Sequence, residues 1–308
     1  MSDRSRTILI SFVLPAAVLA GLVILFFNKM ALSNLILARG DTFLYFYPYW
    51  HAAAEALREA RVPFWNPAIF MGAPLLANSQ AGFFYPLNWP LWLFLETPYA
   101  ASAAILLHLF IASLGVYLVG RKVLSLSRSG SLVAAASFAC GGYLTAQVEH
   151  INQLQGLAWL PWFLLAVELA RQEAIRTWLM AAIAMGGLFA LQLLAGHTQT
   201  TFITAVGILI WICADWLTRR FFAKVQYAAA PERETPAKTF APFSPFTALF
   251  AGALLAVALA AVQLLPTLEL MRYSSRAGGL PANEVMSFSL PPQHLANALL
   301  PAIKQSLF

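Results

Sequence analysis

Long apolar stretches with very few charged side chains constrain this chain more than any other feature of its sequence. Only 10% of its 308 residues are charged and 60% are hydrophobic, whereas soluble domains carry roughly 25% charged residues. A membrane-spanning helix needs about 20 mostly apolar residues, and lipid cannot satisfy the polar groups of irregular backbone. We therefore expect an all-α polytopic membrane protein with about seven transmembrane helices, over residues 8–27, 99–119, 131–147, 154–170, 177–195, 200–216 and 246–266.

The distribution of Lys and Arg predicts which ends of these helices face the cytoplasm, because cytoplasmic loops are enriched in both residues. If the N-terminus is inside, most of the 19 Lys and Arg residues fall in inner segments, and the short outer turns around His150 and His197 hold none. The expected orientation is therefore N-in and C-out. It also accounts for the net charge of +6 without nucleic-acid binding, for which the sequence has no motif.

The domain organisation expected is a single transmembrane module over residues 1–308, forming the N-terminal part of a longer protein. Residues 28–98 form the first extracytoplasmic loop, and within it residues 48–61 predict a helix suited to lie along the membrane surface. Residues 62–92 are rich in Pro, Gly and aromatic side chains and predict an ordered loop packed on the spans. Residues 218–245 read as a cytoplasmic linker, and residues 267–308 begin a further extracytoplasmic segment.

Polar side chains that are far apart in the sequence share the outer side of this topology. Such groups near membrane depth are costly and are often functional. The outer group comprises Arg39, Asp41, Glu149, His150, Asn152, Gln153, His197, Gln199, Gln263, Glu269, Arg272 and Arg276.

Two interpretations of the main acid and histidines stay open. Asp41 either caps the segment that follows it or acts as a general base, since a carboxylate with a pKa near 4 is ionised at neutral pH. His150 and His197 are either interfacial hydrogen-bonding groups or ligands for phosphate and substrate hydroxyls. Their spacing matches no zinc motif, so no metal site is assigned.

The remaining charged residues of the outer group also have two readings. Arg272 and Arg276 either meet lipid headgroups or clamp a lipid-linked phosphate, for which a guanidinium fork is well shaped. Glu149 and Glu269 are either second carboxylates or plain surface charges, and the surface reading is favoured.

Four stretches together resemble the YfhO-like family of bacterial membrane proteins, within the GT-C class of polyprenyl-phosphate-sugar-dependent glycosyltransferases. They are RGDTFLYFYPYW, PFWNPAIFMGAPLLANSQAGFFYPLNW, GHTQTTF and QLLPTLELMRYSSRAGGL, and they extend over nearly the whole chain. The resemblance implies an enzyme of the bacterial inner membrane that moves a sugar from undecaprenyl phosphate to a cell-envelope glycan or lipid acceptor.

In the GT-C pattern an acid just after the first span is catalytic, and that position is Asp41 here. The expected ligands of donor phosphate and substrate are Arg39, His150, His197, Gln199, Arg272 and Arg276. Members of the class often carry a paired acidic motif, whereas Arg39 flanks Asp41 in this chain, so no cofactor is assigned and a divalent metal stays an open alternative. The other functions considered are a non-catalytic membrane scaffold or assembly subunit, and a lipid or solute transporter.

Overall fold

The computed structural model describes residues 12–172, 174–229, 244–274, 277–287 and 289. The chain divides into two compact units, Met1–Thr267 and Leu268–Phe308. Apart from one antiparallel pair of two-residue strands, β1 (Trp65–Asn66) and β2 (Ala73–Pro74), the described secondary structure is helical. The expected all-α class is therefore confirmed.

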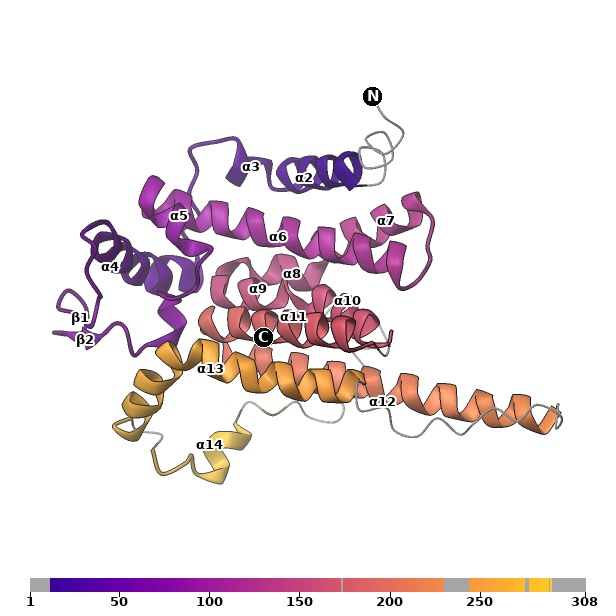
Figure 1. Cartoon of the computed structure of the whole chain (residues 1–308). Helices are drawn as coiled ribbons and strands as arrows, with labels where there is room; N and C mark the ends of the chain where they lie inside the picture. Colours follow the sequence, from indigo (N-terminus) through magenta and orange to yellow (C-terminus); the bar gives the residue numbers. More distant parts are fainter. Residues whose placement is uncertain (1–11, 173, 230–243, 275–276, 288, 290–308) are drawn as a thin grey trace. The chain divides into compact units, whose positions relative to one another are not determined.

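Among the described residues, five helical segments are long and apolar enough to cross a membrane, which makes the chain a multi-pass membrane protein (Figure 1). Four are continuous: α6 (Thr97–Lys122), α11 (Ile175–Leu194), the Thr198–Phe221 part of α12 (Thr198–Ala229), and α13 (Pro245–Arg272). The fifth, Arg128–Glu149, consists of α7 (Arg128–Ala139), α8 (Gly142–Ala146) and the 3₁₀ turn η4 (Gln147–Glu149).

The other two expected spans differ from their predictions. Helix α2 (Leu14–Phe26) is apolar but has 13 residues, and residues 8–11 of the expected first span lie outside the described part of the chain. The expected span over 154–170 is wrong as one continuous helix, because it consists of α9 (Ile151–Leu157) and α10 (Leu160–Ala170). Pro161 lies in the first turn of α10, where its missing N–H costs nothing, whereas inside a longer helix it would remove a hydrogen bond and clash with the preceding turn.

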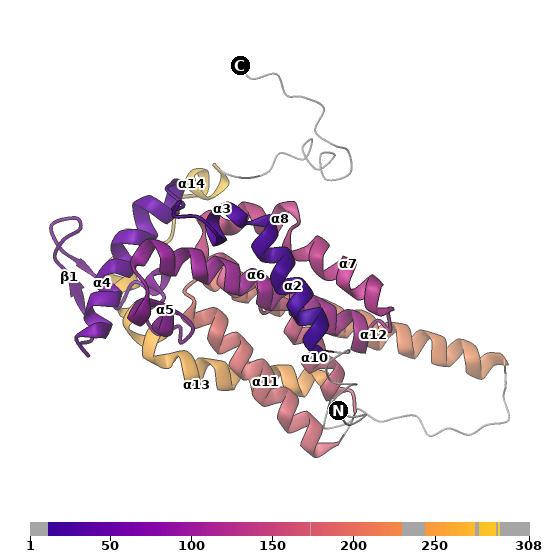
Figure 2. The ribbon, with the colours of Figure 1, turned by 90° about the horizontal axis from the view of Figure 1, so that it is seen from above.

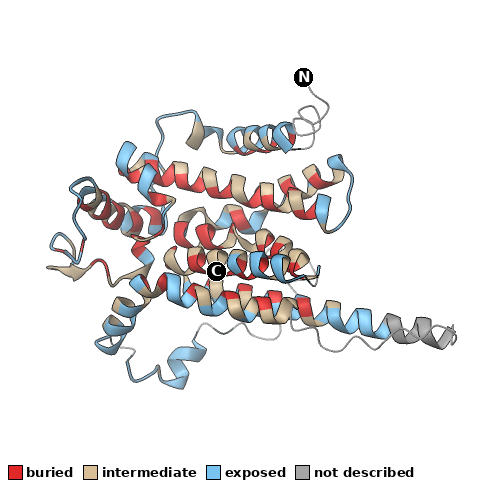
Figure 3. Ribbon diagram, viewed as in Figure 1, coloured by how far each residue is buried: buried red, intermediate tan, exposed pale blue. Residues whose placement is uncertain are grey.

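Helix α6 is the centre of the first unit. It contacts α2, α7, α9 and α10 along its length, and 56% of its most apolar stretch is buried, against 22% for α12. Figure 3 shows the same contrast, with buried residues following α6 and exposed residues frequent on α12. The apolar side chains that α12 leaves exposed, such as Phe202, Ile203 and Ile210, suit contact with lipid.

The predicted helix at 48–61 is present as α4 (Tyr47–Arg58). It follows the short helix α3 (Asn28–Ala31) and a π-helical turn, η2 (Thr42–Phe46), and it precedes the turn η3 (Ser79–Ala81) and α5 (Asn88–Phe94). The face of α4 that carries Trp50 and Ala53 is buried, and the Trp50 and Trp92 rings meet edge to face at 5.3 Å. Helices α4 and α5 and the strands lie together at one end of α6 and α11 (Figures 1 and 2).

Hydrogen bonds from the membrane helices hold the loop that follows β2. On α13, the Gln263 amide donates to the Leu76 carbonyl at 2.9 Å, and the Thr267 hydroxyl donates to the Ala77 carbonyl at 2.9 Å. Gln263 itself is buried. Because a buried donor without a partner costs about 1–3 kcal/mol, these bonds fix the loop on the helices. The prediction of an ordered loop over 62–92 is thus confirmed for this segment.

A second set of bonds joins the same loop to α6 and to the break between α9 and α10. The Tyr85 hydroxyl lies 2.6 Å from His108 Nε2 and accepts a hydrogen bond from Trp159 Nε1 at 3.0 Å. His108 Nδ1 lies 2.6 Å from the Ala104 carbonyl, which can only accept. The proton of a neutral His108 is therefore on Nδ1 and Tyr85 donates to Nε2, so that this buried histidine is structural.

At the opposite end of α10 and α12 from this loop, ion pairs join the two helices. Arg171 Nη2 lies 3.1 Å from Asp215 Oδ1, and Arg219 Nε lies 2.9 Å from Asp215 Oδ2. Arg171 also pairs with Glu168. Since Arg171 is largely buried, Glu168 and Asp215 together supply the countercharge that its guanidinium needs.

Replacing Gly196 tests how tightly the loop is seated on the turn between α11 and α12. Gly196 has φ +89°, and an added Cβ would lie 1.9 Å from the Ser79 carbonyl oxygen. We expect Gly196→Ala to destabilise the protein by roughly 1–3 kcal/mol, seen as a lower melting temperature in detergent. The matched control is Gly207→Ala on α12, where a Cβ meets nothing within 4 Å. An equal loss of melting temperature in the two variants would contradict a close contact between Gly196 and the loop at Ser79.

Candidate functional site

The candidate site lies where the residue 39–42 turn meets the residue 147–150 turn. The Thr42 hydroxyl is buried and lies 3.2 Å from the Glu149 carbonyl oxygen and 3.5 Å from that of Val148, across 107 and 106 positions of sequence. A hydroxyl without a partner at this depth would cost about 1–3 kcal/mol. Thr42 therefore joins the first outer loop to the segment between α8 and α9.

An ion pair and a glycine complete the contact between the two turns. Arg39 Nε lies 2.8 Å from Glu149 Oε1; the arginine side chain is 80% exposed and the glutamate side chain only 23%. Gly40 has φ +50°, and an added Cβ would lie 2.2 Å from Glu149 Oε2. A side chain at position 40 would therefore strain the backbone and collide with the carboxylate.

Asp41 and His150 are brought together by this contact. His150 Nε2 lies 3.4 Å from Asp41 Oδ2, and both side chains are about half exposed, at 48% and 58%. Asp41 precedes η2, but its carboxylate makes no capping hydrogen bond there. The capping interpretation of Asp41 is therefore wrong, and the carboxylate is placed where solvent and an imidazole both reach it.

His197 immediately precedes α12 and belongs to the same end of the bundle. Its Nδ1 accepts a hydrogen bond from the Thr200 backbone N–H at 3.3 Å and lies 2.6 Å from the Thr200 hydroxyl, which is the pattern of a helix N-cap. Burial lowers the pKa of His197, and the neighbouring His150 lowers it further. The neutral ring accepts at Nδ1, so its proton is on Nε2, which makes Nε2 a donor.

Tyr45, whose hydroxyl bonds Asn78, interacts electrostatically with Asp41, and sequence reasoning missed this pair. The Tyr45 and Tyr49 rings are stacked at 4.3 Å, and the Asn78 amide donates to the Tyr45 hydroxyl at 2.7 Å. Burial raises the pKa of Tyr45, and nearby Tyr49 and Asp41 contribute in the same direction. No spacing rule links Tyr45 to Asn78 in the sequence. The phenol is neutral at ordinary pH and lies within electrostatic range of the Asp41 carboxylate.

The other predicted site residues are not brought into this cluster by any described contact. Gln199 is exposed in the first turn of α12. Arg272 is exposed at the end of α13 and belongs to the second unit, and Arg276 lies outside the described residues. Within the described ranges, no group of three or more His, Cys, Asp or Glu side chains is arranged to hold a metal ion.

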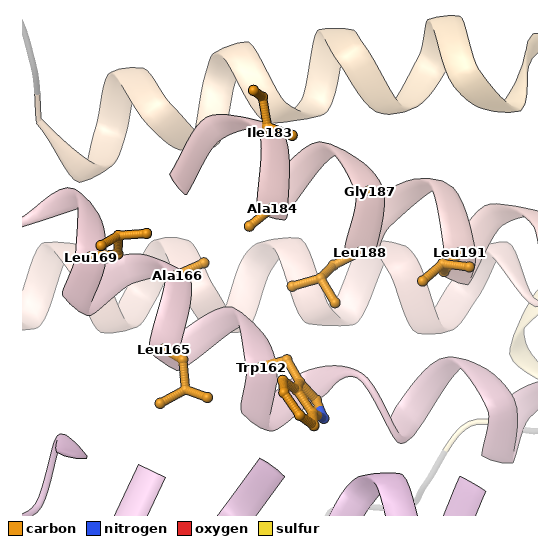
Figure 4. A pocket seen from close by; sticks show the side chains of 9 residues that line it. All are labelled: Trp162, Leu165, Ala166, Leu169, Ile183, Ala184, Gly187, Leu188 and Leu191. Atoms are coloured by element: carbon orange, nitrogen blue, oxygen red, sulfur yellow. The ribbon is translucent and has the colours of Figure 1, made fainter. Parts of the chain in front are cut away.

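A hollow of about 390 Å³ lies elsewhere, between α10 and α11, and is lined almost wholly by carbon (Figure 4). Its only lining nitrogen outside the backbone, Trp162 Nε1, donates to the Ile111 carbonyl at 3.1 Å. This groove offers no acid, base or charged group. Asp41 and His150, which carry a carboxylate and an imidazole, are therefore better candidates for a reactive site than this groove.

Comparisons of the chain with protein-family models, with curated proteins and with solved structures found no match in any of the three. The fold and site define a multi-pass helical membrane protein with an acid–imidazole pair and a second, neutral histidine at one end of its bundle. The resemblance to the YfhO-like family stays a prediction.

The lowered pKa of His197 predicts how stability depends on pH. The folded protein binds a proton at this ring less readily than the unfolded chain does, so stability falls once the pH drops below the ordinary histidine pKa of about 6.5. An asparagine at this position accepts the same Thr200 N–H but does not titrate. We expect His197→Asn to lose less melting temperature than the wild type between about pH 7.5 and 5.5. Equal losses would contradict the assignment.

Proposed function

We propose that the chain is the membrane part of a GT-C-type glycosyltransferase that moves a sugar from an undecaprenyl-phosphate carrier to an extracytoplasmic cell-envelope acceptor. The observation that carries the proposal is the approach of Asp41 Oδ2 to His150 Nε2, at 3.4 Å, on accessible turns at one end of the helices. A half-exposed carboxylate oriented by an imidazole suits a general base that must reach a substrate hydroxyl. The sequence resemblance supplies the sugar donor and the acceptor class.

In this mechanism Asp41 takes the proton of the acceptor hydroxyl as its oxygen attacks the anomeric carbon of the sugar. The new glycosidic bond forms while the bond from that carbon to the phosphate oxygen breaks, and the lipid phosphate leaves with the electron pair. A single displacement inverts the anomeric centre. His150 orients the carboxylate. After the reaction, it relays to water the proton that Asp41 took from the acceptor hydroxyl.

The leaving phosphate needs hydrogen-bond donors placed where its charge develops. His197 supplies a neutral Nε2–H and Arg39 an exposed guanidinium, whose described contact with Glu149 uses Nε. The resemblance adds Gln199, Arg272 and Arg276 to this role. His197 therefore hydrogen-bonds the phosphate without first taking up a proton at neutral pH.

The proposed topology has the N-terminus inside and the site outside the bacterial cytoplasmic membrane. The broken pair α9–α10 serves as the fourth of seven spans, and α2 belongs to the first. Basic residues at the ends of α6, α10 and α12, such as Lys122, Arg171 and Arg219, then face the cytoplasm. Residues 28–98 and 267–308 lie outside. The expected inner linker over 218–245 is shorter than predicted, because α12 continues to Ala229, and the connection from α12 to α13 lies inside.

A lipid or solute transporter is the second candidate, because the helical path is interrupted after Ala139 and after Leu157. Interrupted helices often frame a substrate site in transporters. That reading leaves the pairing of Asp41 with His150 at the rim without a role. Substitution at Asp41 separates the two candidates, since a transporter does not need a base there.

The test is sugar transfer by Asp41→Asn, which keeps the size of the side chain but removes its basicity. Radiolabelled sugar would be followed from polyprenyl phosphate into the cell-envelope fraction, in membranes from a deletion strain complemented at equal protein abundance. We expect kcat/KM to fall by roughly 10²–10⁴.

The matched control is Glu55→Gln, which removes an exposed carboxylate of the same loop that also pairs with a histidine, His51, at 3.3 Å. It is expected to retain wild-type transfer. Full transfer by Asp41→Asn would contradict the mechanism, and no transfer by the wild type would contradict the enzyme assignment.

A further inference from the structure

We infer that Glu149 is a positioning residue for Asp41: it fixes the turn that carries the base and does not itself touch the substrate. The catalytic importance of this role rests on the proposed function. The contacts that define the role are independent of that function. The sequence favours a plain surface charge at this position. Three separate contacts of Glu149 show otherwise.

The first contact is the ion pair with Arg39. A glutamate side chain that is only 23% exposed has lost most of its water, and Arg39 Nε at 2.8 Å supplies a charge-assisted hydrogen bond in return. Because the Arg39 side chain itself is 80% exposed, solvent screens the pair, and it holds the turn together with the other contacts of residue 149 rather than by itself. Arg39 is two residues before Asp41.

The other two contacts lie directly on either side of Asp41. Gly40 approaches the Glu149 carboxylate so closely that an added Cβ would lie 2.2 Å from Oε2, and the Thr42 hydroxyl lies 3.2 Å from the Glu149 carbonyl oxygen. The Thr42 bond is to the main chain of residue 149, so the glutamate side chain acts on the turn through Arg39 and through its close approach to Gly40. His150 follows Glu149 in the chain, so the same contacts set the 3.4 Å separation of Asp41 and His150.

A base role for Glu149 itself fits this geometry poorly. Oε1 is bonded to Arg39, and Oε2 lies against the backbone at Gly40. The Asp41 side chain is 58% exposed and is open to a hydroxyl. Glutamine and alanine at position 149 separate the two roles, since glutamine can still accept the Arg39 hydrogen bond but cannot act as a base.

The experiment combines transfer kinetics with backbone hydrogen exchange of the full chain in nanodiscs. Glu149→Ala is expected to raise the exchange rate of residues 40–46 roughly five-fold, with exchange in α6 unchanged as the check on folding. Its kcat is expected to fall roughly 10- to 100-fold with little change in KM for the lipid-linked donor. Glu149→Gln should recover most of both values.

The matched control is Glu59→Ala, which removes another glutamate–arginine pair of the same loop, Glu59 Oε2 to Arg61 Nη2 at 2.7 Å, with both side chains exposed. It should leave exchange at 40–46 and transfer unchanged. Unchanged exchange at 40–46 in Glu149→Ala would overturn the positioning role. So would a Glu149→Gln variant as inactive as Asp41→Asn with wild-type exchange. Raised exchange in Glu149→Ala together with an inactive wild type would support the positioning role and overturn the proposed function.

Discussion

Thr42 buries its hydroxyl where the first outer loop meets the turn between α8 and α9, 3.2 Å from the Glu149 carbonyl oxygen. This bond and the Arg39–Glu149 ion pair hold together two turns that the sequence separates by more than a hundred residues. The approach of Asp41 to His150 depends on both, because each of these residues adjoins a residue in the contact. These polar contacts therefore hold the two turns in a fixed arrangement at this end of the bundle.

Hydrogen bonds from buried side chains also fix the loop that follows β2. Gln263 and Thr267 donate to its carbonyls from α13, and Tyr85 inserts between α6 and the break before α10. Irregular backbone that is buried inside a protein needs hydrogen-bond partners for its N–H and C=O groups. The loop that carries Asn78, the partner of Tyr45, is thus fixed by the spans themselves.

The sequence predicts the long apolar helices of this structure better than it predicts the contacts between the loops. The uninterrupted apolar runs of α6, α11 and α13 predict their helices, because burial in lipid leaves no alternative to helical hydrogen bonding. The break in the 131–147 span is not predicted: α7 ends at Ala139, and a Cβ at Gly141 would lie 2.5 Å from the Ser137 carbonyl oxygen. Topology correctly gathers Asp41, His150 and His197 at one end. It cannot pair Arg39 with Glu149 or Tyr45 with Asn78, because those partners are set by loop geometry.

We propose that the turns around Asp41, His150 and His197 form the substrate site. A cryo-electron microscopy structure of the protein in a lipid nanodisc with a lipid-linked phosphosugar would test this proposal. We expect phosphate density within hydrogen-bond distance of His197 Nε2, with the sugar beside the Asp41 carboxylate. Phosphate density beside Arg171 and Arg219 at the other end of the bundle would contradict it.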